Sequence, residues 1–303
     1  MRFPLRAAGV RWEQFPCYER NAVRLAFSTL GCPGLSLAQV VELARSSGAT
    51  GLELRVAEGG FVHPDISAKE RAVVARTLSD AGLTVLALAS YVRVCAAPGT
   101  ERGATWAVED ALRSAVELAF DLGAAGVRVF PGAGLDPALG DVVPPQMAQA
   151  DRLGARRLDA AAGAARDSGV TLLLETHDSH PRGEDVARIL AQTDPATPVQ
   201  VIWDLMHPWR HDEAPQRTAA LLAASLAYAQ YKDGRRIPGT NEVTLTLPGA
   251  GELPLRTMRN LAGGIANARG DDEPWVSLEW ERAWHPDLPP LADALAALKA
   301  VLA

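Results

Sequence analysis

The chain has 303 residues and a formal net charge of −6. Proteins that bind duplex nucleic acid usually present a basic surface, so this charge argues against nucleic acid as a partner. No run of the sequence approaches the roughly 18 consecutive apolar residues that a membrane-spanning helix requires, so we expect no membrane partner. Hydrophobic residues make up 48% and charged residues 22% of the chain, which allows a sizeable globular core.

The cysteines and the N-terminus indicate the cellular compartment in which the protein is expected. Cys17, Cys32 and Cys95 lie far apart and form no Cys-x-x-Cys pair, so neither a disulfide framework nor a zinc finger is expected. A cytoplasmic location, in a reducing compartment, fits this pattern. Residues 1–22 contain basic residues but no unbroken apolar core, so they do not resemble a secretory signal. We interpret them as an N-terminal extension to a single domain over 23–303.

Short β-type runs alternate with longer helical runs along the rest of the chain. Ser36 is the expected N-cap of the first helix, Gly48 its C-terminal stop, and Ser67 and Glu70 stand in capping-box spacing at the next helix. The expected strands cover 23–29, 50–56, 83–90, 126–132, 170–176, 199–205, 226–233 and 274–280. The expected helices cover 36–48, 67–82, 102–122, 146–168, 183–193, 213–225 and 289–303.

This alternation indicates a parallel sheet, because a helix is the usual connection between parallel strands. Eight strands, seven of them followed by an expected helix, predict a closed (β/α)8 TIM barrel in the α/β class rather than an open doubly wound sheet. No Gly-x-Gly-x-x-Gly motif follows the first strand, which argues against a dinucleotide site. Long loops are expected over 59–65, 130–146 and 233–254, and long loops in compact domains are usually functional.

Oxygen-bearing side chains stand at or near the ends of four consecutive strands. Glu175 ends the fifth strand, Asp204 the sixth and Glu279 the eighth, and Gln230 lies in the seventh. The C-terminal ends of barrel strands meet at the active site, so three carboxylates would crowd together there. A divalent cation removes the resulting repulsion. Oxygen ligands suit a hard ion, so we expect one divalent cation, Mn²⁺ in preference to Mg²⁺, Co²⁺ or Zn²⁺.

Several of these residues have a structural alternative when taken singly. Asp204 can cap the helix that follows it. Lys232 and Asp233 can form an exposed ion pair, and His207 can be a loop histidine without a ligand. Trp209 can pack against the barrel rather than stack on a sugar ring. The joint occurrence of four acceptors on four neighbouring strands is what favours a site.

Further candidates depend on the strand period. His177 has the same alternation phase as Glu175 and is expected to point inward. His63 follows the second strand in "GGFVHPD" and can reach the barrel mouth. Glu281 shares the face of Glu279, and Glu53 on the second strand is a candidate to support the ligands from behind.

The motifs "LLLETHDSH", "VIWDLMHP", "QYKD" and "VSLEWE" resemble those of the xylose isomerase-like TIM barrels. This family includes sugar phosphate isomerases and epimerases and AP endonuclease family 2. Its pattern has a glutamate on strand 5, Asp-x-x-His on strand 6, His-x-Lys-Asp on strand 7 and a glutamate on strand 8. The resemblance implies that Glu175, Asp204, Gln230 and Glu279 bind the metal. Gln230 is a departure from the pattern, which usually has histidine there.

The resemblance also implies the residues that bind substrate. His207 and Lys232 match the family motifs, and the ketose 3-epimerase branch implies that Arg236 holds substrate oxygens. With His177, His63 and Trp209, they complete the expected substrate-binding set.

The chemistry that follows is a divalent-metal-dependent isomerisation or epimerisation of a sugar or sugar phosphate. Glu175 and Glu279 are the expected catalytic residues, one removing a proton and the other returning it through a metal-stabilised enediolate. A dehydratase or lyase acting on a keto-sugar or keto-polyol begins with the same step and stays open as the alternative. An abasic-site endonuclease and a non-catalytic barrel subunit are less favoured. The expected partner is a small sugar-like substrate, and a homodimer or homotetramer stays open.

Overall fold

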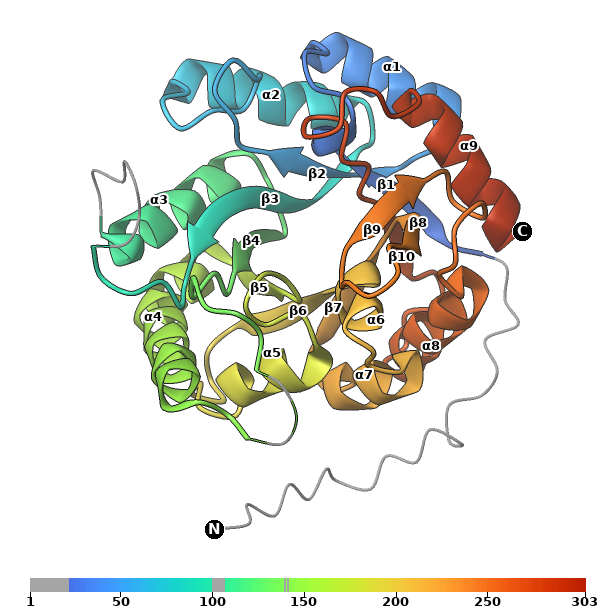
Figure 1. Ribbon diagram of the computed structural model, residues 1–303. Coiled ribbons are helices and arrows are strands. Elements are labelled where there is room, and N and C mark those ends of the chain that lie inside the picture. The colour runs from blue at the N-terminus through green and yellow to red at the C-terminus, as the bar shows by residue number, and fades with distance from the viewer. Residues whose placement is uncertain (1–21, 100–106, 139, 141) are drawn as a thin grey trace.

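The computed structural model describes residues 22–99, 107–138, 140 and 142–303. In this part of the chain, parallel strands close into an eight-stranded barrel in the order β1-β10-β7-β6-β5-β4-β3-β2, with helices around it (Figure 1). The predicted single-domain TIM barrel is confirmed. Its strands are β1 Arg24–Ser28, β2 Gly51–Arg55, β3 Thr84–Arg93, β4 Gly126–Phe130, β5 Thr171–Glu175, β6 Val199–Asp204, β7 Leu226–Tyr231 and β10 Trp275–Leu278.

The helices that cover the barrel follow the strands in the chain. They are α1 Leu37–Ser47, α2 Ala68–Asp80, α3 Val108–Asp121, α4 Pro145–Ser168, α5 Gly183–Leu190, α7 Pro215–Leu222, α8 Leu255–Ala268 and α9 Leu291–Leu302. Two shorter helices, the 3-10 helix η2 Thr29–Gly31 and α6 Met206–Arg210, follow β1 and β6. The sequence patterns named neither short helix and did not name α8.

Local capping chemistry explains where the first helices begin and end. The hydroxyl of Ser36 accepts a hydrogen bond from Gln39 N, and the Gln39 side chain accepts one from Ser36 N, which is a complete capping box. Ser67 and Glu70 form the same arrangement at α2. Gly48 ends α1 with φ +72°, a left-handed conformation that glycine adopts without strain. The predicted caps are therefore confirmed.

The two-residue period of β5 shows how the barrel sorts its side chains. Leu172 and Leu174 pack in the large core between the strands and the helices. Leu173 points the other way, into a small apolar cluster inside the barrel. That inner cluster consists of Ala26, Leu86, Ala87, Leu173, Ile202 and Tyr228. The same period carries Glu175, two residues beyond Leu173, into the barrel interior.

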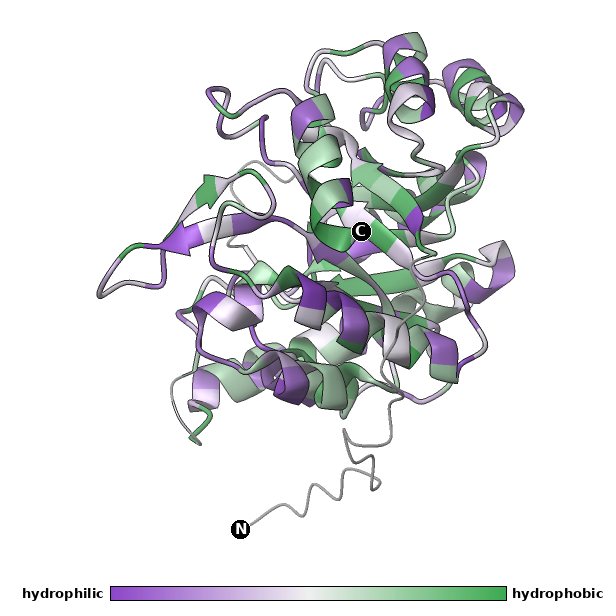
Figure 2. Cartoon of the chain, turned by 90° about the vertical axis from the view of Figure 1, so that its right-hand side faces the viewer, coloured by the Kyte–Doolittle hydropathy of each residue, from purple (hydrophilic) through white to green (hydrophobic). Residues whose placement is uncertain are grey.

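The long loop expected over 233–254 contains a hairpin instead. β8 Asp233–Arg236 and β9 Val243–Thr246 pair antiparallel and project from the barrel mouth (Figures 1 and 2). Val243 and Leu245 alternate with threonines, and both pack against the core, which explains the strand period. The side chain of Asp233 anchors this segment because it accepts hydrogen bonds from the backbone N–H groups of Gly234, Gly249, Gly251 and Leu253.

Some predictions fall on residues 1–21, which lie outside the described residues. The N-terminal extension over 1–22 falls almost wholly there, as does Cys17, so the extension stays a prediction. The expected helix over 102–122 is described from Val108 onward. Among the described residues, no helix combines the length and apolar character needed to cross a bilayer.

Candidate active site

The four expected metal ligands lie at the C-terminal ends of neighbouring strands. Glu175 is the last residue of β5 and Asp204 the last of β6, while Glu279 follows β10 directly. Gln230 in β7 is the register partner of Asp204 on one side and of Ser277 on the other. All four side chains are buried. Residues more than 100 positions apart therefore meet because parallel strands end at one edge.

Carboxylates and imidazoles gather there at metal-binding spacing. Glu175, Asp204 and Glu279 each offer an oxygen, and these oxygens lie within 4.8 Å of one another. Glu175, His177 and His207 form a second group within the same limit. Together these five residues form a possible buried metal site.

Unsatisfied polar atoms mark the same place. Among the described residues, both carboxylate oxygens of Glu175 and both ring nitrogens of His207 are buried without a hydrogen-bond partner. Leaving such an atom unsatisfied costs about 1–3 kcal/mol, so native structures rarely do so without a ligand or a function. Oxygen and imidazole donors are the set that a divalent transition-metal ion accepts, so the residues present fit such an ion.

The carboxylate of Asp204 serves two purposes. Its Oδ1 accepts hydrogen bonds from the backbone N–H groups of Met206 at 2.9 Å and His207 at 3.4 Å, where α6 begins. Its Oδ2 lies 2.7 Å from the ammonium of Lys232. Asp204 therefore caps α6 through one oxygen, as the structural alternative expects, and its role as a metal ligand stays a prediction.

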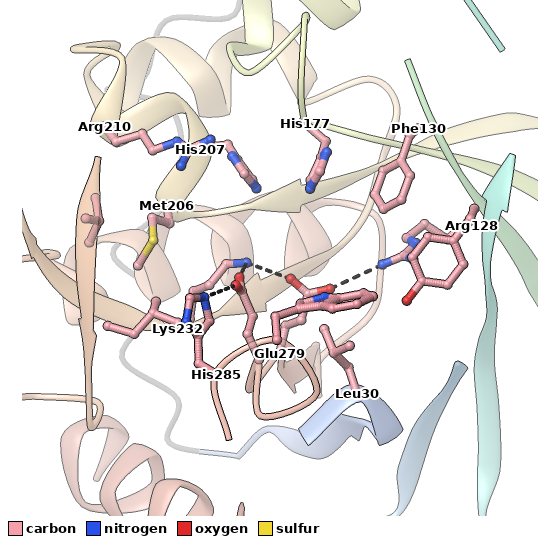
Figure 3. A pocket seen from close by; sticks show the side chains of 15 residues that line it. Leu30, Arg128, Phe130, His177, Met206, His207, Arg210, Lys232, Glu279 and His285 are labelled. Carbon is pink, nitrogen blue, oxygen red and sulfur yellow. Dashed lines mark hydrogen bonds and ion pairs between the residues drawn. The ribbon is translucent and has the colours of Figure 1, made fainter. Parts of the chain in front are cut away.

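Two buried cations hold these carboxylates. Lys232 Nζ lies 2.7 Å from Glu279 Oε2 and 2.5 Å from Glu281 Oε1, in addition to Asp204. Arg128 Nη1 lies 3.2 Å from Glu279 Oε1 and 3.3 Å from Glu175 Oε2. Figure 3 shows Lys232 and Arg128 approaching Glu279 from opposite sides. Lys232 is buried and pairs with these acids, so the structural alternative of an exposed ion pair with Asp233 is not formed.

Gln230 is oriented by a buried acid beneath it. Its Nε2 donates to Glu53 Oε2 at 2.8 Å, and Glu53 also accepts hydrogen bonds from the hydroxyls of Tyr228 and Ser277. Gln230 Oε1 is buried and has no hydrogen-bond partner among the described residues. Because its amide group is held by Glu53, the carbonyl oxygen is left for a ligand.

Burial shifts the proton affinities of the acids and the imidazole. Desolvation raises the pKa of Glu175 well above its ordinary value, and Arg128 opposes this shift only in part. Desolvation, reinforced by the charge of Glu279, likewise raises the pKa of Glu53. Desolvation lowers the pKa of His207 well below its ordinary value.

The pKa of Lys232 moves in the opposite direction from the one that burial favours. Desolvation alone would lower it, but the three surrounding carboxylates raise it well above its ordinary value. Lys232 is therefore a fixed positive charge at the barrel mouth.

A cavity of about 350 Å³ opens above these groups. Glu279, Lys232 and Arg128 contribute to its lining, and His177 and His207 point into it from another wall (Figure 3). The ring of His177 stacks on Phe130 with centroids 4.2 Å apart, and its edge contacts His207 at 4.5 Å. Tyr91, Phe130 and Trp284 are the aromatic members of the lining. The cavity thus combines polar donors, acids and aromatic faces.

Three predicted substrate-binding residues are not among those that line the cavity. His63 lies in the loop before α2, near Glu70. Trp209 packs partly buried against the core, and the guanidinium of Arg236 lies 4.2 Å from the centre of its ring. Arg236 also donates to Asp212 Oδ1 at 2.5 Å and to the carbonyl oxygen of Trp209. Contacts with substrate for these three residues stay predictions.

Known proteins share the whole architecture. The family profile described as xylose isomerase-like TIM barrel matches residues 41–301. The chain belongs to this family. No curated protein matches it in sequence.

Solved structures resemble this xylose isomerase-like barrel over nearly its full length. The 3-keto-D-glucoside 4-epimerase YcjR from E. coli is 16% identical with a TM-score of 0.67, covering 92% of this chain and 98% of its own. The probable 3-DHS dehydratase AsbF from Bacillus anthracis is 16% identical with a TM-score of 0.65, with the same coverages. The IOLI protein with a bound zinc atom is 16% identical with a TM-score of 0.67, covering 92% of this chain and 96% of its own. At these identities the likeness establishes the fold.

The sequence interpretation of this xylose isomerase-like barrel missed Arg128. It occupies the middle of "GVRVF", where Val127 and Val129 pack outward into the core. An arginine at the inward phase of an otherwise apolar strand was the available signal, because a buried guanidinium requires acidic partners. The acids that explain it lie on β5 and after β10, so their identity emerges only from the closed barrel.

Proposed function

We propose that this chain is a divalent-metal-dependent isomerase or epimerase of a sugar or sugar phosphate. The observation that carries the proposal is the meeting of Glu175, Asp204 and Glu279 oxygens within 4.8 Å of one another beside a cavity of about 350 Å³. Gln230 Oε1, unpartnered and fixed by Glu53, is the proposed fourth ligand. A bound dication, Mn²⁺ by preference, would polarise the substrate carbonyl and stabilise the charge left by proton removal.

Two carboxylates are available to move the proton. Glu279 lines the cavity and is the proposed base that removes the proton next to the carbonyl. Glu175, fully buried at the end of β5, is the proposed group that returns the proton. Arg128 bridges both carboxylates and would keep their separation constant during the transfer.

Residues on the other walls are proposed to bind the substrate. His177 and His207 present ring nitrogens towards the cavity, and those of His207 have no hydrogen-bond partner among the described residues. Lys232 supplies a permanent positive charge beside Glu279. The aromatic faces of Tyr91 and Trp284 are suited to stack against a sugar ring.

A dehydratase is the second candidate, and it is favoured by the second carboxyl group beside the proposed base. Expulsion of a hydroxyl group after proton removal needs a proton donor close to the leaving oxygen. Glu175, the proposed carrier of the returned proton, lies beside Glu279 and would supply that proton to the leaving oxygen. The epimerase and the dehydratase among the structural neighbours, YcjR and AsbF, are compatible with either outcome.

Proton exchange tests the proposal directly. The protein loaded with Mn²⁺ is incubated with a panel of keto-sugars in D₂O, and NMR follows deuterium incorporation beside the carbonyl. We expect exchange with at least one sugar, abolished in Glu279→Gln and retained in Glu242→Gln, whose exposed side chain lies on the hairpin loop. Mass spectrometry of the same samples separates the two outcomes, because only a dehydratase releases water. Absence of exchange with every sugar, in protein shown to bind Mn²⁺, would refute the proposed chemistry.

A further inference from the structure

Two arginines line the cavity, and their surroundings differ. Arg128 is buried against Glu175 and Glu279 and donates to the carbonyl oxygen of Ser90. Arg210, the last residue of α6, has no hydrogen-bond or ion-pair partner among the described residues, and its Nε has almost no exposed surface. Figure 3 shows Arg210 on the same wall as His207. One cavity arginine thus serves the protein's own acids, and the other is available to a ligand.

Nearby acids do not account for Arg210. Its charge acts on Asp178, but Asp178 is paired with His177 Nδ1 at 2.8 Å, and no ion pair joins it to Arg210. Asp212, two residues farther along the chain, is paired with Arg236. A half-buried guanidinium with a desolvated, unpartnered Nε is costly unless an acceptor is supplied from outside.

Arg236, a third arginine near the barrel mouth, also differs from Arg210 because protein groups occupy its guanidinium. Arg236, which the resemblance to the ketose 3-epimerase branch implies to hold substrate oxygens, is occupied by Asp212, by the carbonyl oxygen of Trp209 and by the ring of Trp209. Arg210 lies one residue beyond Trp209 and lines the cavity, as Arg236 does not. The arginine suited to hold a substrate oxygen is therefore Arg210.

We propose that Arg210 recognises a carboxylate group on the substrate, remote from the carbons that react. The substrate class is then a keto-sugar acid. This inference rests on the proposed function for the location of the reacting carbons, which lie near Glu279 on the opposite side of the cavity. A guanidinium offers paired N–H donors whose geometry matches a carboxylate.

A carboxylate fits better than a phosphate because of the charge count on this wall. Among the described residues that line the cavity, Arg128 and Lys232 are each paired with protein acids. Arg210 is the one guanidinium or ammonium of the lining that is not. Asp178 lies close enough for Arg210 to influence its pKa, and it would repel a second negative charge. A monoanion is balanced by one guanidinium, whereas a phosphate monoester brings nearly two charges near neutral pH.

Three ligands with one carbon skeleton test the inference. D-fructose, D-fructuronate and D-fructose 6-phosphate differ at carbon 6, which carries a hydroxyl, a carboxylate or a phosphate. Isothermal titration calorimetry measures their affinities for the full chain, once with Mn²⁺ and once after metal removal. We expect D-fructuronate to bind at least about tenfold more tightly than D-fructose, as a charge-assisted bidentate contact predicts.

Substitutions then locate the contact. Arg210→Met should abolish the preference for D-fructuronate, Arg210→Lys should retain part of it, and Arg217→Met should retain all of it. Arg217 is a matched control because its guanidinium is largely exposed on α7 and paired with Glu184. Thermal melting of each variant verifies that it is folded.

The possible results separate this inference from the proposed function. Equal affinities for the three ligands, or a preference that survives Arg210→Met, would overturn it. Tightest binding of D-fructose 6-phosphate through Arg210 would overturn the assignment to a carboxylate. A preference that persists without Mn²⁺ and depends on Arg210 supports the inference even where the exchange experiment shows no proton transfer.

Discussion

Two clusters of buried charge in this barrel contrast with each other. The mouth cluster consists of Arg128, Glu175, Asp204, Lys232 and Glu279. The outer cluster consists of Asp151 on α4, His180 and Arg182 before α5, and Asp185 and Arg188 on α5. Both are built from acids and cations with little exposure. They differ in how completely their acceptor atoms are satisfied.

The acceptors of the outer cluster are paired. His180 Nε2 lies 2.7 Å from Asp151 Oδ1, and its Nδ1 lies 2.9 Å from the hydroxyl of Ser179. Arg188 binds Asp151 Oδ2 at 3.0 Å and Asp185 Oδ1 at 2.7 Å. In the mouth cluster, the oxygens of Glu175 accept no hydrogen bond from the described residues. Satisfied buried charges join elements of a fold, whereas unsatisfied ones cost stability and mark a place for a ligand.

The largest expected effect is on activity at the mouth. Glu175→Gln removes a proposed ligand and proton carrier but keeps the shape of the side chain. We expect proton exchange to fall by about 10³-fold, in the range of a lost acid or base group. Metal analysis should show less than one Mn²⁺ per chain, with the melting temperature within a few degrees of the parent. Unchanged metal content and exchange in this variant would contradict the assignment of Glu175.

The next effect is on stability in the outer cluster. His180→Ala leaves Asp151 without one partner in a buried site and should lower the free energy of unfolding by about 3 kcal/mol. Urea denaturation measures this loss, and the exchange rate per folded molecule should stay at the parent value. A variant that is as stable as the parent but inactive would mean that the outer cluster also serves the reaction.

A smaller effect is expected on metal affinity. Lys232 lies against Asp204 and Glu279, so its positive charge opposes a dication bound to the same carboxylates. Lys232→Met should therefore raise the affinity for Mn²⁺ by about tenfold, as measured by calorimetry. Weaker binding in the variant would indicate that Lys232 orients the ligands more than it repels the ion. Lys299→Met is the control, because that ammonium is exposed and binds the carbonyl oxygen of Ser47.

The smallest expected effect is a difference between the two clusters in how the stability of the metal-free protein depends on pH. The folded-state pKa of Glu175 is raised above 4.5, chiefly by desolvation, so its contribution to stability is lost as the pH rises through 4.5 towards the folded value. For Asp185, desolvation is outweighed by Arg182 and Arg188, and its folded-state pKa falls below 3.8. Its contribution is present above pH 3.8 and is lost as the pH falls through the folded value.

Difference profiles of urea stability against pH test these opposite signs. Glu175→Gln should gain stability relative to the parent as the pH rises above 4.5. Asp185→Asn should lose stability at neutral pH and approach the parent in acid. If the stability of both variants relative to the parent changed in the same direction with rising pH, the distinction between the clusters would be removed.

The sequence by itself determined the alternation of strands and helices, the capping boxes at Ser36 and Ser67, and the ends of β5 and β6. These features depend on short-range periods and on hydrogen bonds that span three or four residues. The repeated alternation of strands and helices predicts the barrel, and the two-residue period of β5 places Glu175 on its interior face. The expectation that Glu175, Asp204 and Glu279 meet rested on the same local rules, once eight strands had been counted.

The tertiary structure alone decided which cation serves which acid. Arg128 reaches Glu279 across 151 positions, and Gln230 is oriented by Glu53 across 177. Arg210, rather than Arg236, lines the cavity because Asp212 and Trp209 occupy Arg236. The closure of the barrel and the desolvation of charges inside it determine these partners. Both depend on residues distant in the chain, so local sequence patterns cannot predict them.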